Sequence, residues 1–337
     1  MKFGWRGALG VAVSAVFLYF AFRSLNLADA LEKARHANYW LLVASALTAT
    51  CMFPLRAIRW RTILDPVAPK LPFGPLWRSV AIGQMVTNTV PLRAGELARA
   101  FALTRQIPSV SFATSLASVA VDRVFDGIVT MLLLAAGVML AHFPASTSIG
   151  RYSLNHAAWL VVAGSVALLT GFYALVFFPD MLIRLFELVA RRVSATVERR
   201  GSEMLRRFAE GLSVLRTPWH FAVVTWWTLL HWVLRPVAFW LALLALDIHV
   251  SFAATLVLQG IIVILVAIPA APGFFGPFEI GASLALGLYG VSKSDALTYA
   301  LLFHVASFIP ITLIGAYYFI RLGVHMGDIN SAAGSGE

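Results

Sequence analysis

Long apolar runs separated by short polar segments dominate the chain from end to end. A helix needs about 20 predominantly apolar residues to cross the hydrocarbon layer of a bilayer. The pattern therefore predicts an all-α polytopic membrane protein with six full transmembrane helices. Their expected ranges are 7–22, 39–55, 112–141, 157–178, 219–246 and 295–320.

Two further apolar segments, 76–91 and 252–289, are interrupted by helix-breaking residues. Such breaks are tolerated at membrane depth only where the freed backbone is buried in protein or lines a polar cavity. We expect both segments to enter the membrane and return, from opposite faces, as in an inverted repeat that holds a transport site. The breaks are at Pro91 and Gly95, and at Pro272, Gly273, Gly276 and Pro277.

The N-terminal apolar run has two interpretations. Lys2 and Arg6 precede it, and Ala28 and Ala30 resemble a cleavage site, as in a secretory signal peptide. We favour a retained first helix, because the run is long for a signal peptide and the rest of the chain is polytopic. One membrane domain is then expected over 1–330, with a polar tail at 331–337.

Composition adds information mainly through the charged residues. The 337 residues are 60% hydrophobic and 12% charged, whereas soluble domains have about 25% charged residues. This excludes a soluble enzyme and a disordered protein. The formal charge of +10 would suggest nucleic acid in a soluble protein. Here the basic residues gather in loops, which marks the cytoplasmic side of a membrane, so we expect no nucleic-acid partner.

Two basic segments set the predicted orientation. One follows the second span and the other lies at 179–216, whereas loops 142–156 and 247–251 carry only Arg151. Both chain termini are therefore expected in the cytoplasm. The first segment contains Arg56, Arg59, Arg61, Lys70 and Arg78.

Segment 179–216 has arginines on one side of a helical wheel and apolar residues on the other. Such a helix lies in the headgroup plane of an anionic cytoplasmic leaflet, and a solvated connector helix is an equally good interpretation. The arginines are Arg184, Arg191, Arg192, Arg199, Arg206 and Arg207, and the apolar residues are Phe186, Val193, Val197, Met204, Phe208 and Leu212.

Eight charged residues fall at or near the expected membrane depth. Each costs about 2.5–3.5 kcal/mol on an isolated helix, so we expect them to be paired, hydrated or both. The signs sum to zero, as mutual pairing requires. They are Glu96, Asp122, Asp126 and Glu279 against Arg93, Arg99, Arg123 and Arg235.

Spacing indicates which of these side chains can meet. Arg93, Glu96 and Arg99 are three apart, so they share one face of the helix after the first break. A polar stripe at three-to-four spacing runs along the span 112–141, and it faces a partner or a water-filled cavity rather than lipid. The stripe consists of Ser111, Ser115, Ser118, Asp122 and Asp126, with Arg123 at its edge.

Glu279 stands third in a helix that begins at Gly276 and Pro277. It can complement the positive end of the helix dipole. The free N–H groups at this helix start also form an anion site, beside which Glu279 could receive a cation or a proton. The two roles are compatible.

Three polar or aromatic residues, Trp227, His231 and Arg235, recur every four residues on the span 219–246. An arginine in this position can hold a phosphate bidentately. The alternative is pairing with an aspartate of the stripe. His304 on the last span is expected to be a hydrogen-bonded packing residue, with a place in a proton pathway as the alternative.

Motifs of nucleotide and hydrolytic chemistry are absent. There is no Walker loop, dinucleotide fingerprint, His-Glu-x-x-His motif or nucleophile elbow. The one cysteine, Cys51, excludes disulfide scaffolds and cysteine-rich metal sites. We expect no enzymatic activity, no cofactor and no metal.

Four stretches resemble the transmembrane domain of the lysylphosphatidylglycerol synthase/flippase family, also described as the flippase-like or uncharacterised 0104 family. Their order and spacing cover roughly 40–320. They are Arg59-Trp60-Arg61, the run from Asn88 to Arg99, the run from Val121 to Asp126, and the run from Ala271 to Glu279. The resemblance implies movement of a polar-headed lipid between leaflets of the bacterial cytoplasmic (inner) membrane. Family members are associated with aminoacylated phosphatidylglycerol, and others with lipid-linked sugars or hopanoid pathways.

The sequence departs from the family pattern in three respects. No soluble aminoacyl-transferase domain follows the last span, so the resemblance implies a stand-alone flippase without synthase activity. His304 stands where the family often has an arginine. Asp122 and Phe274 replace the more usual Glu and Gly.

These features favour translocation of a phosphate-containing lipid through a charge-lined groove. Arg99, Arg123 and Arg235 would engage the phosphate, while the four acids pair with them at rest and accept a cationic headgroup amine in transit. Arg93 belongs to the same site. Accessory roles fall to Asn88, Trp227, His231 and His304.

Two alternatives remain. One is an ion-coupled small-solute transporter. The other is a membrane enzyme or accessory subunit acting on polyprenyl-linked sugars, with Asp29 and Glu32 as its acids. The expected partners are a membrane phospholipid or lipid-linked substrate and the anionic cytoplasmic leaflet. A homo-oligomer and a separate lipid-modifying enzyme are both compatible with the sequence.

Overall fold

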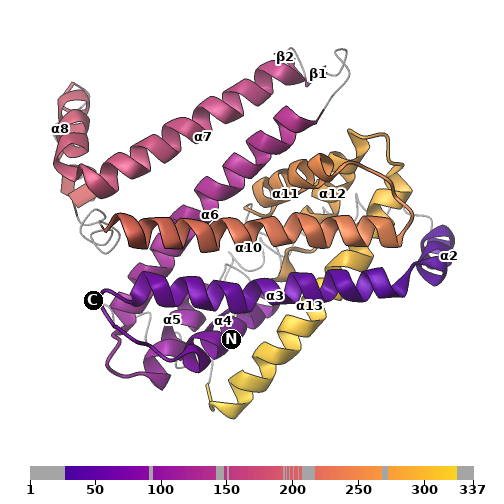
Figure 1. Cartoon of the computed structure of the whole chain (residues 1–337), viewed down its shortest axis with the longest axis horizontal. Helices are drawn as coiled ribbons and strands as arrows, with labels where there is room; N and C mark the ends of the chain where they lie inside the picture. The colour runs from indigo at the N-terminus through magenta and orange to yellow at the C-terminus, as the bar shows by residue number, and fades with distance from the viewer. Residues whose placement is uncertain are drawn as a thin grey trace.

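Long helices make up most of the protein (Figure 1). The computed structural model describes residues 27–90, 94–141, 148–149, 152–192, 217–267 and 272–324, together with 194, 196, 198–199, 201–203 and 205–206. The helices are α2 (Leu27–His36), α3 (Tyr39–Leu64), α4 (Phe73–Thr89), α5 (Gly95–Gln106), α6 (Phe112–Leu140), α7 (Leu154–Phe177), α8 (Pro179–Ala190), α10 (Pro218–Ala245), α11 (Phe252–Val266), η2 (Pro272–Phe274), α12 (Pro277–Gly287) and α13 (Lys293–Arg321). Two short strands, β1 (Ser148–Ile149) and β2 (Tyr152–Ser153), pair antiparallel.

Four of these helices, α3, α6, α10 and α13, are long and apolar enough to cross a membrane. Helices α7 and α8 form a fifth span if the pair, bent by 118°, counts as one. The chain is thus a multi-pass, mainly helical membrane protein, as predicted, but the described residues do not show six spans. The expected first span at 7–22 and the polar tail at 331–337 lie outside the described residues.

The second span is longer than predicted. The apolar run ends near residue 55, whereas α3 continues to Leu64. The added turns carry Arg56 and Arg59, which are 9% and 0% exposed. The prediction that both arginines lie in a cytoplasmic loop is therefore wrong, because ion pairs on neighbouring helices let the helix continue through charged residues.

Side chains at the helix ends explain where several helices begin. Asn38 accepts hydrogen bonds from the backbone N–H groups of the first turn of α3. Ser111, Ser251 and Ser292 cap α6, α11 and α13 in the same way. A capping side chain satisfies donors that the helix itself leaves unpaired.

Each of the two predicted broken segments forms a helical hairpin. In the first, the side chain of Gln106 near the end of α5 hydrogen-bonds Ser79 near the start of α4. At the other end, a Cβ on Gly95 would lie 2.0 Å from the carbonyl oxygen of Gly83. Only glycine permits this approach. In the second hairpin, a Cβ on Gly281 of α12 would lie 3.2 Å from Ile262 of α11.

Helices α3 and α10 run side by side and antiparallel along the long axis of the molecule (Figure 1). The Asn38 N–H donates to the carbonyl of Ala245 at one end of the pair, and His220 lies 3.7 Å from Asp65 at the other. The α4–α5 hairpin packs on α3, while α13 packs on α4.

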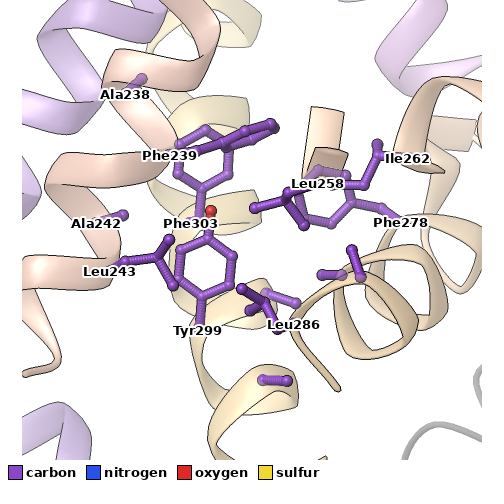
Figure 2. Packing of buried hydrophobic residues seen from close by; sticks show 14 of the residues in the cluster. Ala238, Phe239, Ala242, Leu243, Leu258, Ile262, Phe278, Leu286, Tyr299 and Phe303 are labelled. Atoms are coloured by element: carbon purple, nitrogen blue, oxygen red, sulfur yellow. The ribbon is translucent and has the colours of Figure 1, made fainter. Parts of the chain in front are cut away.

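The largest apolar core joins α10, α11, α12 and α13 (Figure 2). Phe239 and Phe303 meet edge to face at 4.7 Å between ring centroids, and Phe278 stacks on Phe303 at 6.0 Å. This core fixes the second hairpin against the two long helices, so it positions the residues at the second break.

Helix α8 turns sharply away from α7 and leaves an apolar stripe exposed. Met181, Leu185 and Leu188 are 61%, 56% and 63% exposed, and their spacing places them on one face. The predicted apolar face instead included Phe186, which packs against Gly201. Val193, Val197, Met204, Arg207, Phe208 and Leu212 lie outside the described residues.

Candidate functional site

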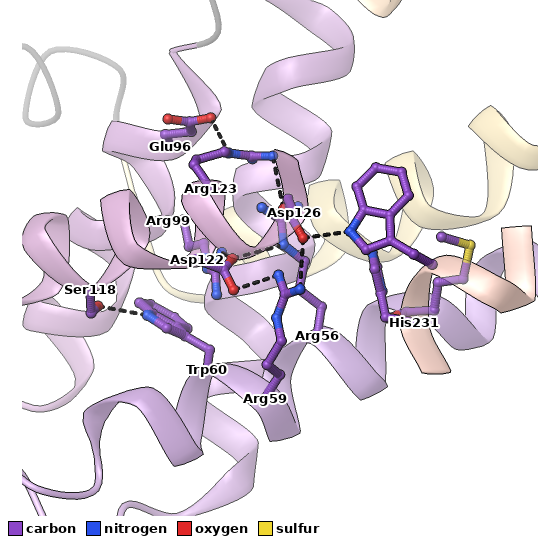
Figure 3. A network of polar contacts seen from close by, with 12 residues as sticks. Arg56, Arg59, Trp60, Glu96, Arg99, Ser118, Asp122, Arg123, Asp126 and His231 are labelled. Atoms are coloured by element: carbon purple, nitrogen blue, oxygen red, sulfur yellow. Dashed lines mark hydrogen bonds and ion pairs between the residues drawn. The ribbon is translucent and has the colours of Figure 1, made fainter. Parts of the chain in front are cut away.

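A cluster of arginines and carboxylates joins α3, α5 and α6 inside the helical bundle (Figure 3). Asp122, which is 0% exposed, lies at its centre. Arg59 Nη2 lies 2.5 Å from Asp122 Oδ1, and Arg99 Nη1 lies 2.7 Å from Asp122 Oδ2. A longer contact of 3.3 Å joins Arg56 Nε to the same Oδ2. The buried Asp122 carboxylate thus contacts three arginines and partly neutralises their charge.

Asp126, one turn along α6, connects this cluster to α10. Its Oδ1 lies 2.7 Å from Arg59 Nη1 and accepts a 2.6 Å hydrogen bond from the indole nitrogen of Trp232. Its Oδ2 lies 3.4 Å from Arg123 Nη1. The aspartate is therefore held by groups from three helices.

Glu96 and Arg123 form the more open edge of the cluster. Arg123 Nε lies 2.6 Å from Glu96 Oε1, and these side chains are 39% and 30% exposed. Glu96 lies in the first turn of α5, where the helix dipole favours a negative charge. An ion pair as open as this one can exchange partners at lower cost than the buried pairs.

The aromatic ring of Trp60 packs against the cluster. Arg99 lies over this ring at 3.9 Å from its centroid, and the ring nitrogen donates a 2.8 Å hydrogen bond to Ser118. Ser118 and Asp122 of the polar stripe therefore face partner helices, as predicted, whereas Ser111 caps α6 and is exposed.

An open pocket of about 1050 Å³ adjoins the cluster. Helices α3, α4, α5, α6, α10 and α11 all contribute to its wall, so both broken segments line it. Its charged and hydrogen-bonding side chains are Arg56, Gln84, Thr87, Glu96, Arg123, Asp126, Thr130, His231, Trp232 and Arg235.

Arg235 differs from the other arginines of this pocket. Its guanidinium carbon lies 5.2 Å from the ring centroid of Trp232. Among the described residues, no carboxylate forms an ion pair with it. The alternative in which Arg235 pairs with Asp122 or Asp126 is therefore wrong, since Arg59, Arg99 and Arg123 occupy those carboxylates.

The charges of the site do not balance. The described cluster and pocket contain five arginines, at 56, 59, 99, 123 and 235, against three carboxylates, at 96, 122 and 126. This set differs from the eight residues expected to pair with one another: Arg56 and Arg59 join it, Glu279 has a different partner, and Arg93 lies outside the described residues. Cluster and pocket together have two positive charges in excess. The pocket wall itself has three arginines against two carboxylates, so it is suited to an anion.

A second pocket, of about 730 Å³, lies next to the first. The two share Phe53, Gln84, Arg235, Val266 and Phe274 in their walls. Asn88 and His304 line only the second, where Asn88 donates to the hydroxyl of Thr312.

Glu279 lies behind the wall of this second pocket and has two roles. Its Oε2 accepts a 2.6 Å hydrogen bond from the N–H of Gly276, which caps α12. Its Oε1 lies 2.7 Å from Nδ1 of His304. The expected helix-start role is confirmed, and the side chain that Glu279 contacts is a histidine rather than an arginine.

The remaining predicted residues are dispersed. His231 is buried, with its Nδ1 3.0 Å from the carbonyl oxygen of Met52, and lines the first pocket. Trp227 lines neither of these two pockets. Arg93 and Pro91 lie outside the described residues. No group of three potential metal ligands occurs in the part of the chain that the structure describes.

Three residues of the site were not predicted from the sequence. Arg56 and Arg59 were interpreted as loop residues that mark the cytoplasmic side. The accessory role on the span 219–246 was assigned to Trp227 rather than to Trp232. Helical spacing on α3 offered a signal, because Arg56, Arg59 and Trp60 fall within one turn and on neighbouring sides of the helix.

Comparison with known proteins gives two matches. The model of the lysylphosphatidylglycerol synthase TM region matches residues 7–315. Glycosyltransferase AglD of Haloferax volcanii is 36% identical over 110 residues, which is 32% of this chain. The aligned part spans only 16% of the length of that relative.

Proposed function

Because the chain belongs to the lysylphosphatidylglycerol synthase TM region family, we propose that it moves a phosphate-containing lipid from one membrane leaflet to the other. The observation that carries the proposal is the pocket beside the charge cluster, which is lined by three arginines and two carboxylates. Arg235 is its cation without a carboxylate partner among the described residues.

The physical problem of lipid transfer fits this arrangement. A phospholipid headgroup must cross about 30 Å of hydrocarbon, where a bare charge is costly. In the proposal the headgroup moves through the two adjoining pockets while its acyl chains remain in the lipid. Arginine suits the phosphate because its planar fork offers two parallel hydrogen bonds.

In the proposal, the open ion pair of Glu96 and Arg123 separates during transit, and each side chain binds a part of the headgroup. Arg123 is bound by Glu96 and Asp126 at rest. When a phosphate arrives, Arg123 joins Arg235 in binding it, and Glu96 becomes available for a cationic headgroup amine. Asp122 stays buried among its arginines and keeps the helices in place.

Reconstituted vesicles test this function. Purified protein should move fluorescent phospholipids of several headgroup classes faster than protein-free vesicles. Glu96→Gln or Arg123→Gln should abolish transfer while the helical content by circular dichroism stays unchanged. The proposal would be contradicted if vesicles with wild-type protein transferred every lipid class no faster than protein-free vesicles.

A small-solute transporter needs a closed site instead of one open to lipid. Elongated lipid density in the paired pockets of the protein in a nanodisc supports lipid transfer. Uptake of a soluble solute without any lipid movement would support the transporter.

The likeness to a glycosyltransferase favours a second candidate, an enzyme or accessory subunit acting on polyprenyl-linked sugars. Its acids would be Asp29 and Glu32, both on α2. Purified protein would then form a glycosylated product, and Asp29→Asn or Glu32→Gln would eliminate it. Product formation that survives both substitutions would exclude these acids.

A further inference from the structure

A carboxylate and an imidazole are buried together at the second break, away from the arginine cluster. Glu279 on α12 is 1% exposed and His304 on α13 is 7% exposed. His304 Nδ1 lies 2.7 Å from Glu279 Oε1, and His304 Nε2 lies 2.8 Å from the carbonyl oxygen of Gly273. The lipid-transfer steps described above use neither side chain.

The hydrogen-bond partners of His304 determine how many protons the pair holds. A carbonyl oxygen can only accept, so Nε2 must carry a hydrogen. The short contact between Nδ1 and the carboxylate needs one more proton, because two lone pairs would otherwise face each other in a buried site. Glu279 and His304 therefore share one exchangeable proton.

The surroundings can accommodate an imidazolium facing a carboxylate. Glu279 accepts the N–H of Gly276 and lies in the first turn of α12, where the dipole stabilises a negative charge. Phe275 stacks on the His304 ring at 4.2 Å between centroids, and Phe278 lies at 4.6 Å. Aromatic faces attract a cation.

Few other charges face the pair. Among the described residues that line the second pocket, Arg235 of α10 is the one further charged group. Helices α3 and α11 contribute only apolar side chains, and α4 contributes the amides of Gln84 and Asn88. Arg235 also lines the first pocket, so it connects the pair electrostatically with the proposed phosphate position.

We propose that Glu279 and His304 form a proton-binding site that couples proton uptake to binding of a phosphodiester headgroup. The inference rests on the proposed function. When the proton leaves, the Nδ1–H bond breaks, its electron pair stays on the nitrogen, and the proton passes to water. The pair then changes from neutral to singly negative, attracts Arg235 and repels phosphate. Proton and phosphate binding therefore strengthen each other.

Nitrogen NMR tests the proton site directly. In protein labelled with ¹⁵N-histidine and held in bilayers, His304 should give two N–H signals at low pH and lose one between about pH 5 and 8. His304→Gln assigns these signals, and Glu279→Gln should change the Nδ1 signal, because the carboxylate that shares this proton is lost. A His304 signal that keeps one form across this range overturns the proposal.

Calorimetric binding of glycerophosphoglycerol tests the coupling. This phosphodiester keeps a single negative charge over the range, so any pH dependence belongs to the protein. Wild-type affinity should fall about tenfold on raising the pH through the His304 transition. His304→Gln should bind with no such dependence, whereas the control His249→Gln, exposed beyond α10, should behave like wild type.

The outcomes separate the two proposals. A wild-type protein that binds no phosphodiester at any pH contradicts the proposed function, and the coupling with it, while the nitrogen signal still decides whether the pair binds a proton. Equal affinity at every pH, together with a titrating His304, overturns the coupling alone.

Discussion

At the scale of single residues, the arginines of the site divide into two kinds. Arg59 and Arg99 are buried and paired with aspartates, so their charges are used to hold α3, α5 and α6 together. Arg235 is half-buried in a pocket wall and pairs with no described carboxylate. Removing a charge of the first kind should affect stability, and removing one of the second kind should affect function.

Asp122→Asn should strongly destabilise the protein. The change leaves parts of three buried arginines without their counter-ion, and breaking a buried ion pair costs about 3–5 kcal/mol. Thermal unfolding in detergent should show a clear decrease in Tm. Asp247→Asn, at a 96% exposed carboxylate, is the matched control. Equal Tm values for both variants would contradict a structural role for Asp122.

The sequence identified Asp122, Asp126, Arg99, Arg123 and Glu96 among the membrane-depth charges that need partners, and spacing placed those of each helix on or near one face. The sequence analysis placed Arg56 and Arg59 in a loop. Hydropathy treats an arginine as the end of a span, and it contains no information about an ion-pair partner on another helix. It also could not tell that Glu279 meets His304, because this contact joins two helices across a break.

At the scale of helices, the two breaks were the most predictable feature. Proline and glycine in an apolar run predicted where α4 gives way to α5 and α11 to α12. The tight packing inside the first hairpin was not predictable, because it depends on which glycine faces which backbone. Gly83 and Gly95 oppose each other closely, as small residues often do between membrane helices.

Gly95→Ala should disrupt the first hairpin. The added methyl would lie 2.0 Å from both the Gly83 carbonyl oxygen and the Thr87 hydroxyl, so the two helices must separate. We expect lower Tm and lower transfer activity together. Gly164→Ala on α7, where a methyl meets no atom within 4 Å, should raise stability slightly through helix propensity. Equal effects of both changes would contradict the packing.

At the scale of the whole molecule, the antiparallel pair of α3 and α10 separates two ends of the protein. Lys70 follows α3 at one end, and Asp247 follows α10 at the other. From the basic residues in the loops we predict that the first end faces the cytoplasm.

Cysteine labelling tests this orientation. In a Cys51→Ser background, which removes the one cysteine of the chain, Lys70→Cys should react with a membrane-impermeant maleimide only from the cytoplasmic side. Asp247→Cys should react only from the opposite side. Labelling of both positions from one side would contradict the predicted topology.

The central claim is that Arg235, which forms no ion pair with any carboxylate in the described part of the chain, binds the phosphate of a transported lipid. The most direct measurement is the transfer rate of fluorescent phosphatidylglycerol in vesicles containing equal amounts of Arg235→Gln or Arg61→Gln protein, the latter at an exposed arginine of α3. We predict that Arg235→Gln slows transfer about tenfold or more, since a charge-assisted hydrogen bond contributes about 1.5–3 kcal/mol, while Arg61→Gln retains the wild-type rate. Equal rates in the two variants would contradict the account.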